Sequence, residues 1–287
     1  MLNQVQSEVN GILGDRFLEE YSRESTIRRY TKETAGCGIQ YLLDHDYGKL
    51  YFDVLEKCVP KSRMQAGIRL WEFGCGGGMN LIHLVSKLEE HGITVSAAHG
   101  TDFSPRLIDA ARLEAETYLS TEQRKKVRFW VARNENLIDD VTQASEIRKE
   151  HLLGSFDLIL GVNTIRYCHR LGNEDKCVRE ILSLLSPGGA CIVIDMNDKF
   201  PAFRSRVRDR LTKGKRACYL PSLDQYARPF LSAGFRILRK ANFCWIPHSA
   251  GLQLTAFMKT LTPVLNGVAP SRAMRSVIVA QKDFSAR

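Results

Sequence analysis

Four glycines lie close together in the segment "EFGCGGGMN", where the main chain carries almost no side chains. Gly74, Gly76, Gly77 and Gly78 follow an apolar run that ends at Phe73, and they precede an amphipathic run. Glycine adopts the positive φ angles of a sharp strand-to-helix turn, and it lets a ligand approach the main chain at a helix N-terminus. The spacing therefore predicts a turn that binds a ligand through its backbone.

Two common classes of ligand do not fit the residues around this turn. A phosphate-binding P-loop requires Lys and then Ser or Thr after its last glycine, but Met79 and Asn80 stand there. A dinucleotide fingerprint requires G-x-G-x-x-G, but the sixth position counted from Gly74 is Met79. The pattern that remains is E-x-G-x-G-x-G, from Glu72 to Gly78.

This pattern resembles the first motif of the class I, Rossmann-like S-adenosylmethionine (SAM)-dependent methyltransferases, (D/E)-x-G-x-G-x-G. Three further segments match that family in order: "GTDFSP", the strand "FDLILGVN" and the turn "LSPGG". The resemblance spans residues 70–195 and is to the small-molecule branch, which includes ubiquinone/menaquinone-type and natural-product methyltransferases. It implies SAM as the cofactor and S-adenosyl-L-homocysteine (SAH) as its product.

The resemblance also implies which residues contact the cofactor. Asp102 stands where the family's acidic residue accepts both ribose hydroxyls, and the alternative is a helix-capping carboxylate beside Ser104. Arg133 occupies the position of the family's adenine-binding Asp, and a cation cannot accept a hydrogen bond from an amine. Asn134, Glu135 or a backbone carbonyl is therefore expected to bind the adenine. The expected cofactor contacts are Glu72, Gly74, Cys75, Gly76, Gly78, Asp102, Phe103, Asn134, Glu135, Gly161, Asn163, Tyr30 and Tyr41.

Candidate catalytic residues follow the fourth and fifth expected strands. Methyl transfer from a sulfonium is a direct displacement, so the protein mainly aligns the reactants, excludes water and supplies a base where the acceptor loses a proton. Arg166 and Tyr167 replace histidines that many relatives carry, and Arg166 is interpreted as a grip on an anionic group. His169 and Asp195 are the other candidates. Their alternatives are a hydrogen-bonded or surface histidine and a carboxylate that caps a turn.

The elements that must position these residues follow from hydrophobic periodicity. Strands are expected at 68–73, 94–102, 126–132, 156–163, 190–197, 235–246 and 275–282, and helices at 48–59, 79–92, 104–119, 173–186 and 222–234. Ser104 and Ser222 are expected N-caps, and Pro187-Gly188-Gly189 is expected to close a helix. Strands that alternate with amphipathic helices predict an α/β fold with a parallel sheet covered on both faces. The expected architecture is Rossmann-like, with a seven-stranded, mostly parallel sheet.

Two regions outside the motifs are expected to shape the acceptor side. Residues 1–66 are predicted to form a helical lid, and residues 67–287 the SAM-binding domain with an acceptor-site insert at about 246–274. Tyr30 and Tyr41 would contact the methionine moiety, or else pack against the core. His248, in the insert, would reach the site from above. The insert also holds an apolar helix, which could line the acceptor pocket, touch a membrane surface, form a homodimer interface or cover the core.

Charge and composition restrict the partners. The net charge is +9, and the segment 204–216 is rich in Lys and Arg. This segment is either a solvated helix face or an electropositive rim for an anionic acceptor, a phosphorylated lipid headgroup or RNA. No aromatic residue is interleaved in it, so a nucleic-acid partner is not expected. The eight cysteines form no C-x-x-C pair, which disfavours zinc or a disulfide framework, and no metal is expected.

The sequence therefore predicts a cytoplasmic SAM-dependent methyltransferase that acts in biosynthesis on a small organic acceptor. That acceptor would be a metabolite, a natural-product intermediate or a lipid-like molecule, with an anionic group possible. No segment is apolar enough for a signal peptide or a membrane span, although peripheral membrane contact stays open. The alternatives are an RNA or protein methyltransferase and a non-catalytic subunit that binds SAM.

Overall fold

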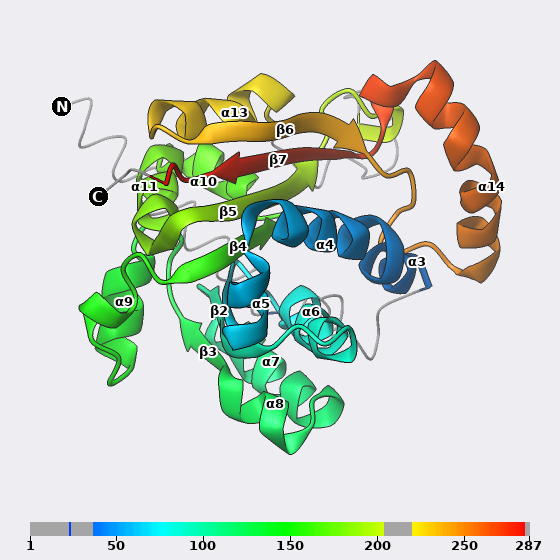
Figure 1. The fold of residues 1–287 in the computed structure, drawn as a ribbon. Coiled ribbons are helices and arrows are strands. Elements are labelled where there is room, and N and C mark those ends of the chain that lie inside the picture. The colour runs from blue at the N-terminus through cyan, green and yellow to red at the C-terminus, as the bar shows by residue number, and fades with distance from the viewer. Residues whose placement is uncertain (1–22, 24–36, 204–219, 285–287) are drawn as a thin grey trace.

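The computed structural model describes residue 23, residues 37–203 and residues 220–284. Figure 1 shows these residues as a twisted sheet with helices on both sides. Tyr30 and the basic segment 204–216 were singled out from the sequence, and both lie outside the described residues.

The sheet has seven strands in the order β3-β2-β1-β4-β5-β7-β6. The strands are β1 (Ile68–Phe73), β2 (Val95–Asp102), β3 (Val127–Val131), β4 (Phe156–Val162), β5 (Leu185–Met196), β6 (Arg236–Phe243) and β7 (Arg275–Gln281). The pairs among β1 to β5 are parallel, and β7 runs antiparallel to both β5 and β6. The prediction of a seven-stranded, mostly parallel Rossmann-like sheet is confirmed.

The strand order reverses between β1 and β4. From β1 the chain proceeds outward through β2 and β3, and it returns to β4 on the other side of β1. In an open parallel sheet, ligands bind at the carboxyl ends of the strands beside such a reversal. The glycine turn after β1 and the residues after β4 therefore share one edge.

Helices cover both faces of the sheet (Figure 1). They are α3 (Cys37–Tyr41), the π-helical turn η2 (Leu42–Asp46), α4 (Tyr47–Cys58), α5 (Lys61–Ala66), α6 (Met79–Glu90), α7 (Pro105–Tyr118), α8 (Thr121–Lys126), α9 (Leu137–Ala144), α10 (Ile165–Leu171), α11 (Glu174–Leu184), α13 (Leu223–Ser232) and α14 (Leu252–Val268). Short 3₁₀ turns are η3 (Lys149–His151), η4 (Pro201–Phe203) and η5 (Pro270–Arg272).

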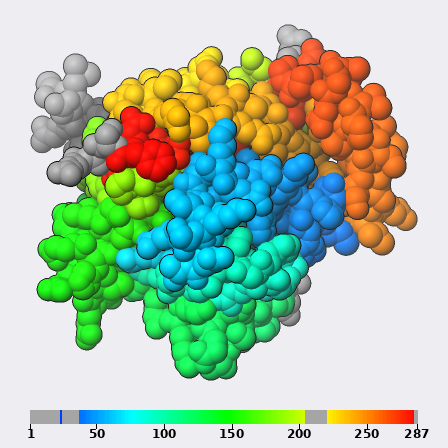
Figure 2. Space-filling view, in the orientation of Figure 1, coloured from blue at the N-terminus to red at the C-terminus, as the bar shows by residue number. Residues whose placement is uncertain are grey.

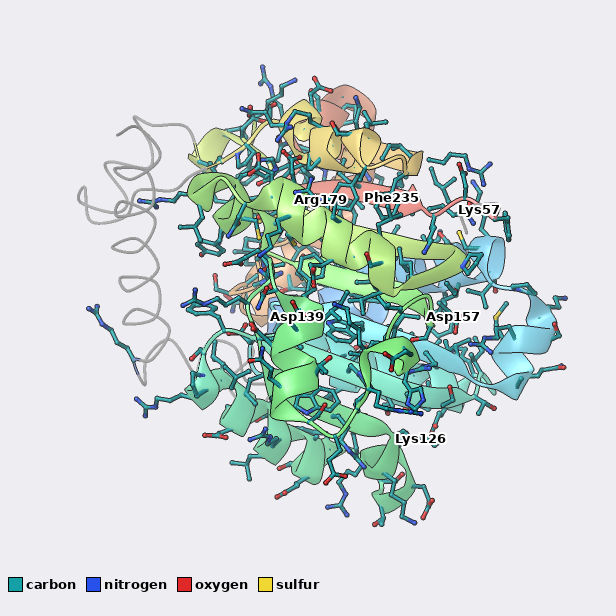
Figure 3. The ribbon with its side chains drawn as sticks, turned by 90° about the vertical axis from the view of Figure 1, so that its left-hand side faces the viewer. Lys57, Lys126, Asp139, Asp157, Arg179 and Phe235 are labelled. Carbon is teal, nitrogen blue, oxygen red and sulfur yellow. The ribbon has the colours of Figure 1, made fainter. Side chains whose placement is uncertain are left out.

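Two hydrophobic cores lie on opposite faces of the sheet. The first packs α4, α6 and α7 against the sheet through residues such as Leu50, Leu84 and Ile108. The second packs α9, α10, α11 and α13 through residues such as Ile181 and Phe230. Figure 3 shows this second face, with Asp139 on α9 and Arg179 on α11. Burial of these side chains is the main force that holds the helices to the sheet.

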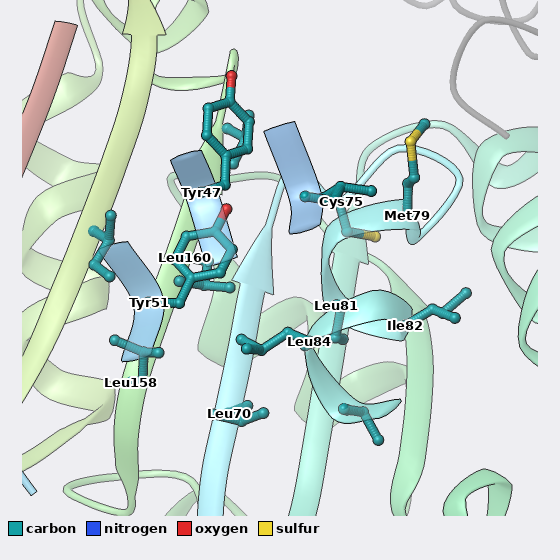
Figure 4. Close-up of a cluster of buried hydrophobic side chains, with 14 of the residues drawn as sticks. Tyr47, Tyr51, Leu70, Cys75, Met79, Leu81, Ile82, Leu84, Leu158 and Leu160 are labelled. Carbon is teal, nitrogen blue, oxygen red and sulfur yellow. The ribbon is translucent and has the colours of Figure 1, made fainter. Parts of the chain in front are cut away.

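The segment α3-η2-α4 belongs to the first core. Leu42 and Leu55 are fully buried in the same cluster as Leu158 of β4. Figure 4 shows Tyr47 and Tyr51 of α4 against this part of the sheet. The segment therefore packs directly on the sheet, and the domain division at residue 66 stays a prediction.

Most expected elements form close to their predicted bounds, with one difference at the start of β5. Residues Pro187 to Gly189, expected to close a helix, lie inside β5 instead. Gly188 has a φ of +78°, and its N–H donates to the Lys282 carbonyl at 3.1 Å, so the strand continues through a local irregularity. The prediction was wrong because pairing with the end of the chain was not visible from local sequence.

The two expected serine caps behave differently. Ser222 forms a full capping box with Gln225 at the start of α13, as predicted. Ser104 occupies the N-cap position of α7, but its side chain makes no capping hydrogen bond there. The N-cap position of Ser104 was predicted correctly, but the expected capping hydrogen bond does not form.

Helix α14 extends along the side of the molecule and is prominent in Figures 1 and 2. Among its residues only Thr255 is buried. Its exposed apolar side chains are Leu252, Leu254, Phe257, Val264 and Val268. Because these side chains are exposed, α14 does not simply cover the core. Its expected contact with the acceptor, a membrane surface or a second copy of the chain stays a prediction. None of the described helices has both the length and the apolar character that crossing a membrane requires.

Candidate functional site

The glycine turn after β1 requires glycine for both conformation and space. Gly74, Gly76 and Gly78 have φ angles of +60°, +55° and +76°. A Cβ on Gly74 would lie 2.1 Å from the Thr164 hydroxyl oxygen, and one on Gly78 would lie 3.0 Å from the Phe129 ring. The turn therefore keeps its main chain bare while it packs against the start of the segment after β4.

Buried hydrogen bonds fasten this turn to its neighbours. The Glu72 carboxylate accepts from Asn80 Nδ2 at 3.0 Å and from the Leu81 N–H at 3.1 Å. The Cys75 N–H donates to the Thr101 carbonyl at 2.8 Å. Burial raises the pKa of Glu72 to about 8, although these hydrogen bonds oppose the shift. Glu72 thus closes the turn onto the start of α6, and its contact with a cofactor stays a prediction.

Asp102, the last residue of β2, joins that strand to the glycine turn. Its Oδ2 accepts from the Gly76 N–H at 3.0 Å and its Oδ1 from the Ser104 N–H at 3.0 Å. Burial raises the pKa of Asp102 to about 6, and the N–H groups of Ser104, Gly76 and Phe103 counteract it. The contact with Ser104 is the capping alternative that the sequence left open. A carboxylate has about four lone-pair positions, and three backbone N–H groups donate to this one, so capacity for one more hydrogen bond, from a ribose hydroxyl, remains.

The residues after β4 meet the glycine turn from the other side of the reversal. Asn134 Nδ2 donates to the Thr164 hydroxyl at 2.9 Å, which places Asn134 beside Gly74. No donor among the described residues reaches Asn134 Oδ1, so this oxygen is free to accept from an amine. Arg133 is exposed and Glu135 half-buried. Thr164 was missed in the sequence, where "GVNT" gives no chemical signal of its own.

Two other expected cofactor residues, at the end of β4 and directly after it, have contacts within the protein. A Cβ on Gly161 would lie 2.2 Å from the Phe73 ring, so this glycine makes room for that ring. Asn163 has a φ of +57°, which is unusual for a residue other than glycine. Its N–H donates to the Ile194 carbonyl at 2.7 Å, and its Oδ1 accepts from Arg275 Nη1 at 2.6 Å.

Three of the expected catalytic residues come together at the ends of β4 and β5. Asp195 is buried and accepts from the backbone N–H groups of Arg166, at 3.1 Å, and Met196, at 2.8 Å. The Arg166 guanidinium lies 3.7 Å from the Asp195 carboxylate, contacts the Met196 sulfur and donates to the Tyr167 hydroxyl at 2.9 Å. Burial raises the pKa of Asp195, and the charge of Arg166 opposes that shift.

His169 lies apart from this group, in the packing between α10, α11 and α13. Its Nδ1 is 3.3 Å from Glu174 Oε1, and its ring meets Tyr226 edge-on at 5.7 Å. Burial lowers the pKa of His169, while the neighbouring Glu174 raises it. The hydrogen-bonded histidine that the sequence offered as an alternative matches this placement.

A buried pair that the sequence analysis did not anticipate forms near the same edge. The Tyr47 hydroxyl and His248 Nε2 are 2.9 Å apart, although 201 positions separate them. Figure 4 shows the Tyr47 hydroxyl directed beyond the carboxyl end of β1, the same end of the strand at which Cys75 of the glycine turn lies. Burial raises the pKa of Tyr47, and burial together with the charges of Arg275 and Arg166 holds the pKa of His248 well below its usual value. Both groups are therefore neutral at pH 7.

Tyr41, the last residue of α3, contacts η2 and α14. Its ring centroid lies 4.4 Å from that of His45, and the Lys259 ammonium lies 4.6 Å from the Tyr41 ring centroid. This is the aromatic packing that the sequence left open, and a contact with the methionine moiety stays a prediction.

A family model described as "Methyltransferase domain" matches residues 65–234, which include the glycine turn, Asp102 and Asp195. The match covers more than half of the chain. The chain belongs to this methyltransferase family. The methyltransferase is of the class I, SAM-dependent type, as its first motif indicated. No curated protein matches its sequence.

Solved structures with the same fold agree with this assignment. The citrinin polyketide synthase CMeT domain aligns with a TM-score of 0.53 and 19% identity over 83% of this chain and 52% of that one. The cyclase SpnF aligns with a TM-score of 0.52 and 18% identity over 82% of this chain and 81% of that one. A SAM-dependent methyltransferase from Mesorhizobium loti aligns with a TM-score of 0.52 and 20% identity over 84% of this chain and 100% of that one. The methyltransferase thus spans about half the length of the solved citrinin CMeT-domain chain, and at these identities the likeness concerns the fold.

Proposed function

We propose that this methyltransferase transfers the methyl group of SAM to a small organic acceptor bound beside the carboxyl ends of β4 and β5 and the amino end of β7. The observation that carries the proposal is the bare glycine turn hydrogen-bonded to Asp102 at the reversal of strand order. This arrangement supports a nucleoside cofactor with its ribose at Asp102 and its main contacts along the turn.

The described residues fit such a cofactor. Asp102 offers its remaining acceptor position to the ribose diol, and Asn134 Oδ1 offers an acceptor to the adenine amine. Gly74, Gly76 and Gly78 have positive φ angles and carry no side chain, which suits close approach of the cofactor chain to the backbone of the turn. When bound, SAM supplies an activated methyl group. The protein then has to hold the acceptor in line with it and keep water away.

The acceptor side contains two groups that can accept a proton, His248 and Asp195. His248 is neutral at pH 7, and when its Nε2–H donates to the Tyr47 oxygen, Nδ1 is the basic nitrogen. Asp195 is held by Arg166 and by two backbone N–H groups, which suits it to orient Arg166 and Tyr167. We therefore assign proton removal to His248 and acceptor contact to Arg166 and Tyr167.

A small acceptor is favoured over RNA by the placement of the basic surface that the structure describes. Arg112, Arg124, Lys125 and Arg128 line a shallow hollow beside α7, α8 and the first residues of β3. The amino end of β3 faces away from the carboxyl edge, because the strands of this part of the sheet are parallel. RNA bound in that hollow would not reach the methyl group.

The seven cysteines among the described residues are free thiols, which suits a reducing compartment. We therefore place the enzyme in the cytoplasm and in a biosynthetic reaction.

Calorimetric titration with SAH tests the cofactor site directly. Saturable binding is expected, and its absence would refute the proposal. Transfer of labelled methyl from SAM to the small-molecule fraction of a cell extract then tests the acceptor class. This second step is needed because SpnF, which shares the fold, is described as a cyclase. Label found only in RNA or protein would favour the alternative activity.

A further inference from the structure

Arg275 stands at the edge of the sheet where the acceptor is proposed to bind. It is the first residue of β7 and pairs with Met196, the last residue of β5, and with Phe243, the last residue of β6. Its side chain is buried, with 4% of the residue exposed. Nη1 donates to Asn163 Oδ1, so the guanidinium extends across the end of β5 toward the end of β4.

This guanidinium has no anionic partner among the described residues. Asn163 supplies a neutral amide oxygen, and the Cys244 thiol is a weak second acceptor. The buried Nε atom has no hydrogen-bond partner in the part of the chain that the structure describes. A buried guanidinium is a fixed positive charge, and leaving it without a counter-charge is costly. The site is therefore incomplete as the described residues form it.

The Asp195 carboxylate does not complete it. Asp195 senses the charge of Arg275, but it is already held by the Arg166 guanidinium and by the N–H groups of Arg166 and Met196. The positive charges of Arg275 and Arg166 also disfavour protonation of His248. The surroundings of Arg275 thus disfavour another cation and favour an anion.

We propose that Arg275 is the anchor for a carboxylate group of the methyl acceptor, which makes the acceptor an organic acid. The Nε edge of a guanidinium pairs with a carboxylate through two parallel hydrogen bonds, and Nε is the atom left without a partner here. Asn163 Oδ1 accepts from Nη1 at the opposite end of the guanidinium and so fixes the orientation of that group. The neighbouring His248 then faces an acceptor whose position is fixed by its acid group. This proposal rests on the proposed methyl-transfer function and names its substrate class.

The test compares acids with their neutral amides on the full chain saturated with SAH. Benzoate and benzamide, and malonate and malonamide, serve as matched probes in thermal melts and calorimetry. Each acid is expected to raise the melting temperature, because a ligand that binds only the folded state stabilises it, whereas each amide leaves it unchanged. Equal shifts with acid and amide, or no shift with either acid, would overturn the proposal.

Variants locate the effect. Arg275→Gln is expected to abolish the rise in melting temperature with acids. Arg275→Lys is expected to weaken it, because Lys keeps the charge but cannot donate two parallel hydrogen bonds. Arg239→Gln on β6, which removes the same charge from an exposed position, is the matched control and should retain the shift. A rise in melting temperature with the acids that persists in Arg275→Gln would contradict the assignment of Arg275 as the anchor.

The two proposals fail separately. SAH that does not bind the wild-type protein removes the methyl-transfer function. SAH that binds while the acids have no effect removes only the carboxylate anchor. Should Arg275→Gln fail to fold, which loss of SAH binding would reveal, the comparison of acid with amide on the wild-type protein still decides the matter.

Discussion

The backbone N–H of Gly76 donates to the Asp102 carboxylate at 3.0 Å, so the turn after β1 and the end of β2 are joined at the point where the cofactor is proposed to bind. Each of these residues fixes the orientation of the other. The glycine supplies a positive φ angle that directs its N–H, and the carboxylate is fixed in place to face a diol. A cofactor that contacts the turn and the carboxylate therefore meets a preformed site.

Asp102→Ala is expected to weaken SAH binding by about 1–3 kcal/mol, because ribose hydroxyls and the Gly76 N–H lose their acceptor. This corresponds to roughly a 5-fold to 150-fold higher Kd in calorimetry. Asp109→Ala, which removes an exposed carboxylate paired with Arg112 on α7, is the matched control and should bind SAH normally. An unchanged Kd for Asp102→Ala would remove this residue from the site.

The pH dependence of cofactor binding should follow Asp102. Burial raises its pKa to about 6, so the carboxylate gains a proton and loses acceptor capacity as the pH falls below that value. SAH affinity is therefore expected to decline from about pH 6 downward. Since the folded-state pKa lies above the ordinary one, protonating Asp102 in this range favours the folded state rather than opposing it. Isothermal titrations between pH 5 and 8, paired with denaturant melts, separate the two effects, and a flat affinity profile would contradict the role of Asp102.

The sequence predicted the strands and the glycine turn because these features are local, and the cofactor contact of Asp102 stays a prediction. Ile68–Phe73 was predicted to its bounds, since an apolar run ended at glycines. The pairing of Tyr47 with His248 could not be predicted, because it depends on how α4 and the segment after β6 pack against each other. The same holds for Arg275, which approaches Asn163 only through the antiparallel pairing of β7 with β5. Long-range packing, not residue type, decides these contacts.

Gly74→Ala is expected to lower the free energy of unfolding by about 2–4 kcal/mol, from backbone strain together with the overlap at Thr164. Gly92 is the matched control: its φ is +75°, but a Cβ there meets nothing within 4 Å. Gly92→Ala should therefore show strain alone, about 1 kcal/mol. Denaturant unfolding measures both variants. Equal losses in the two would mean that close packing against Thr164 does not constrain the turn.

Tyr47→Phe is expected to reduce methyl transfer at least about tenfold while SAH affinity stays unchanged, because His248 loses the partner that fixes its ring and tautomer. The same change should cost about 1–2 kcal/mol of unfolding free energy, since a buried ring nitrogen is left without a hydrogen bond. Tyr51→Phe is the matched control on the same helix. The Tyr51 hydroxyl is buried without a hydrogen-bond partner among the described residues, so its removal should leave turnover unchanged and stability equal or higher. Turnover with saturating SAM, SAH calorimetry and denaturant melts on both variants separate a role in catalysis from a role in packing. If Tyr47→Phe lost stability but kept full turnover, the pair would be structural, and proton removal would have to be assigned to another group.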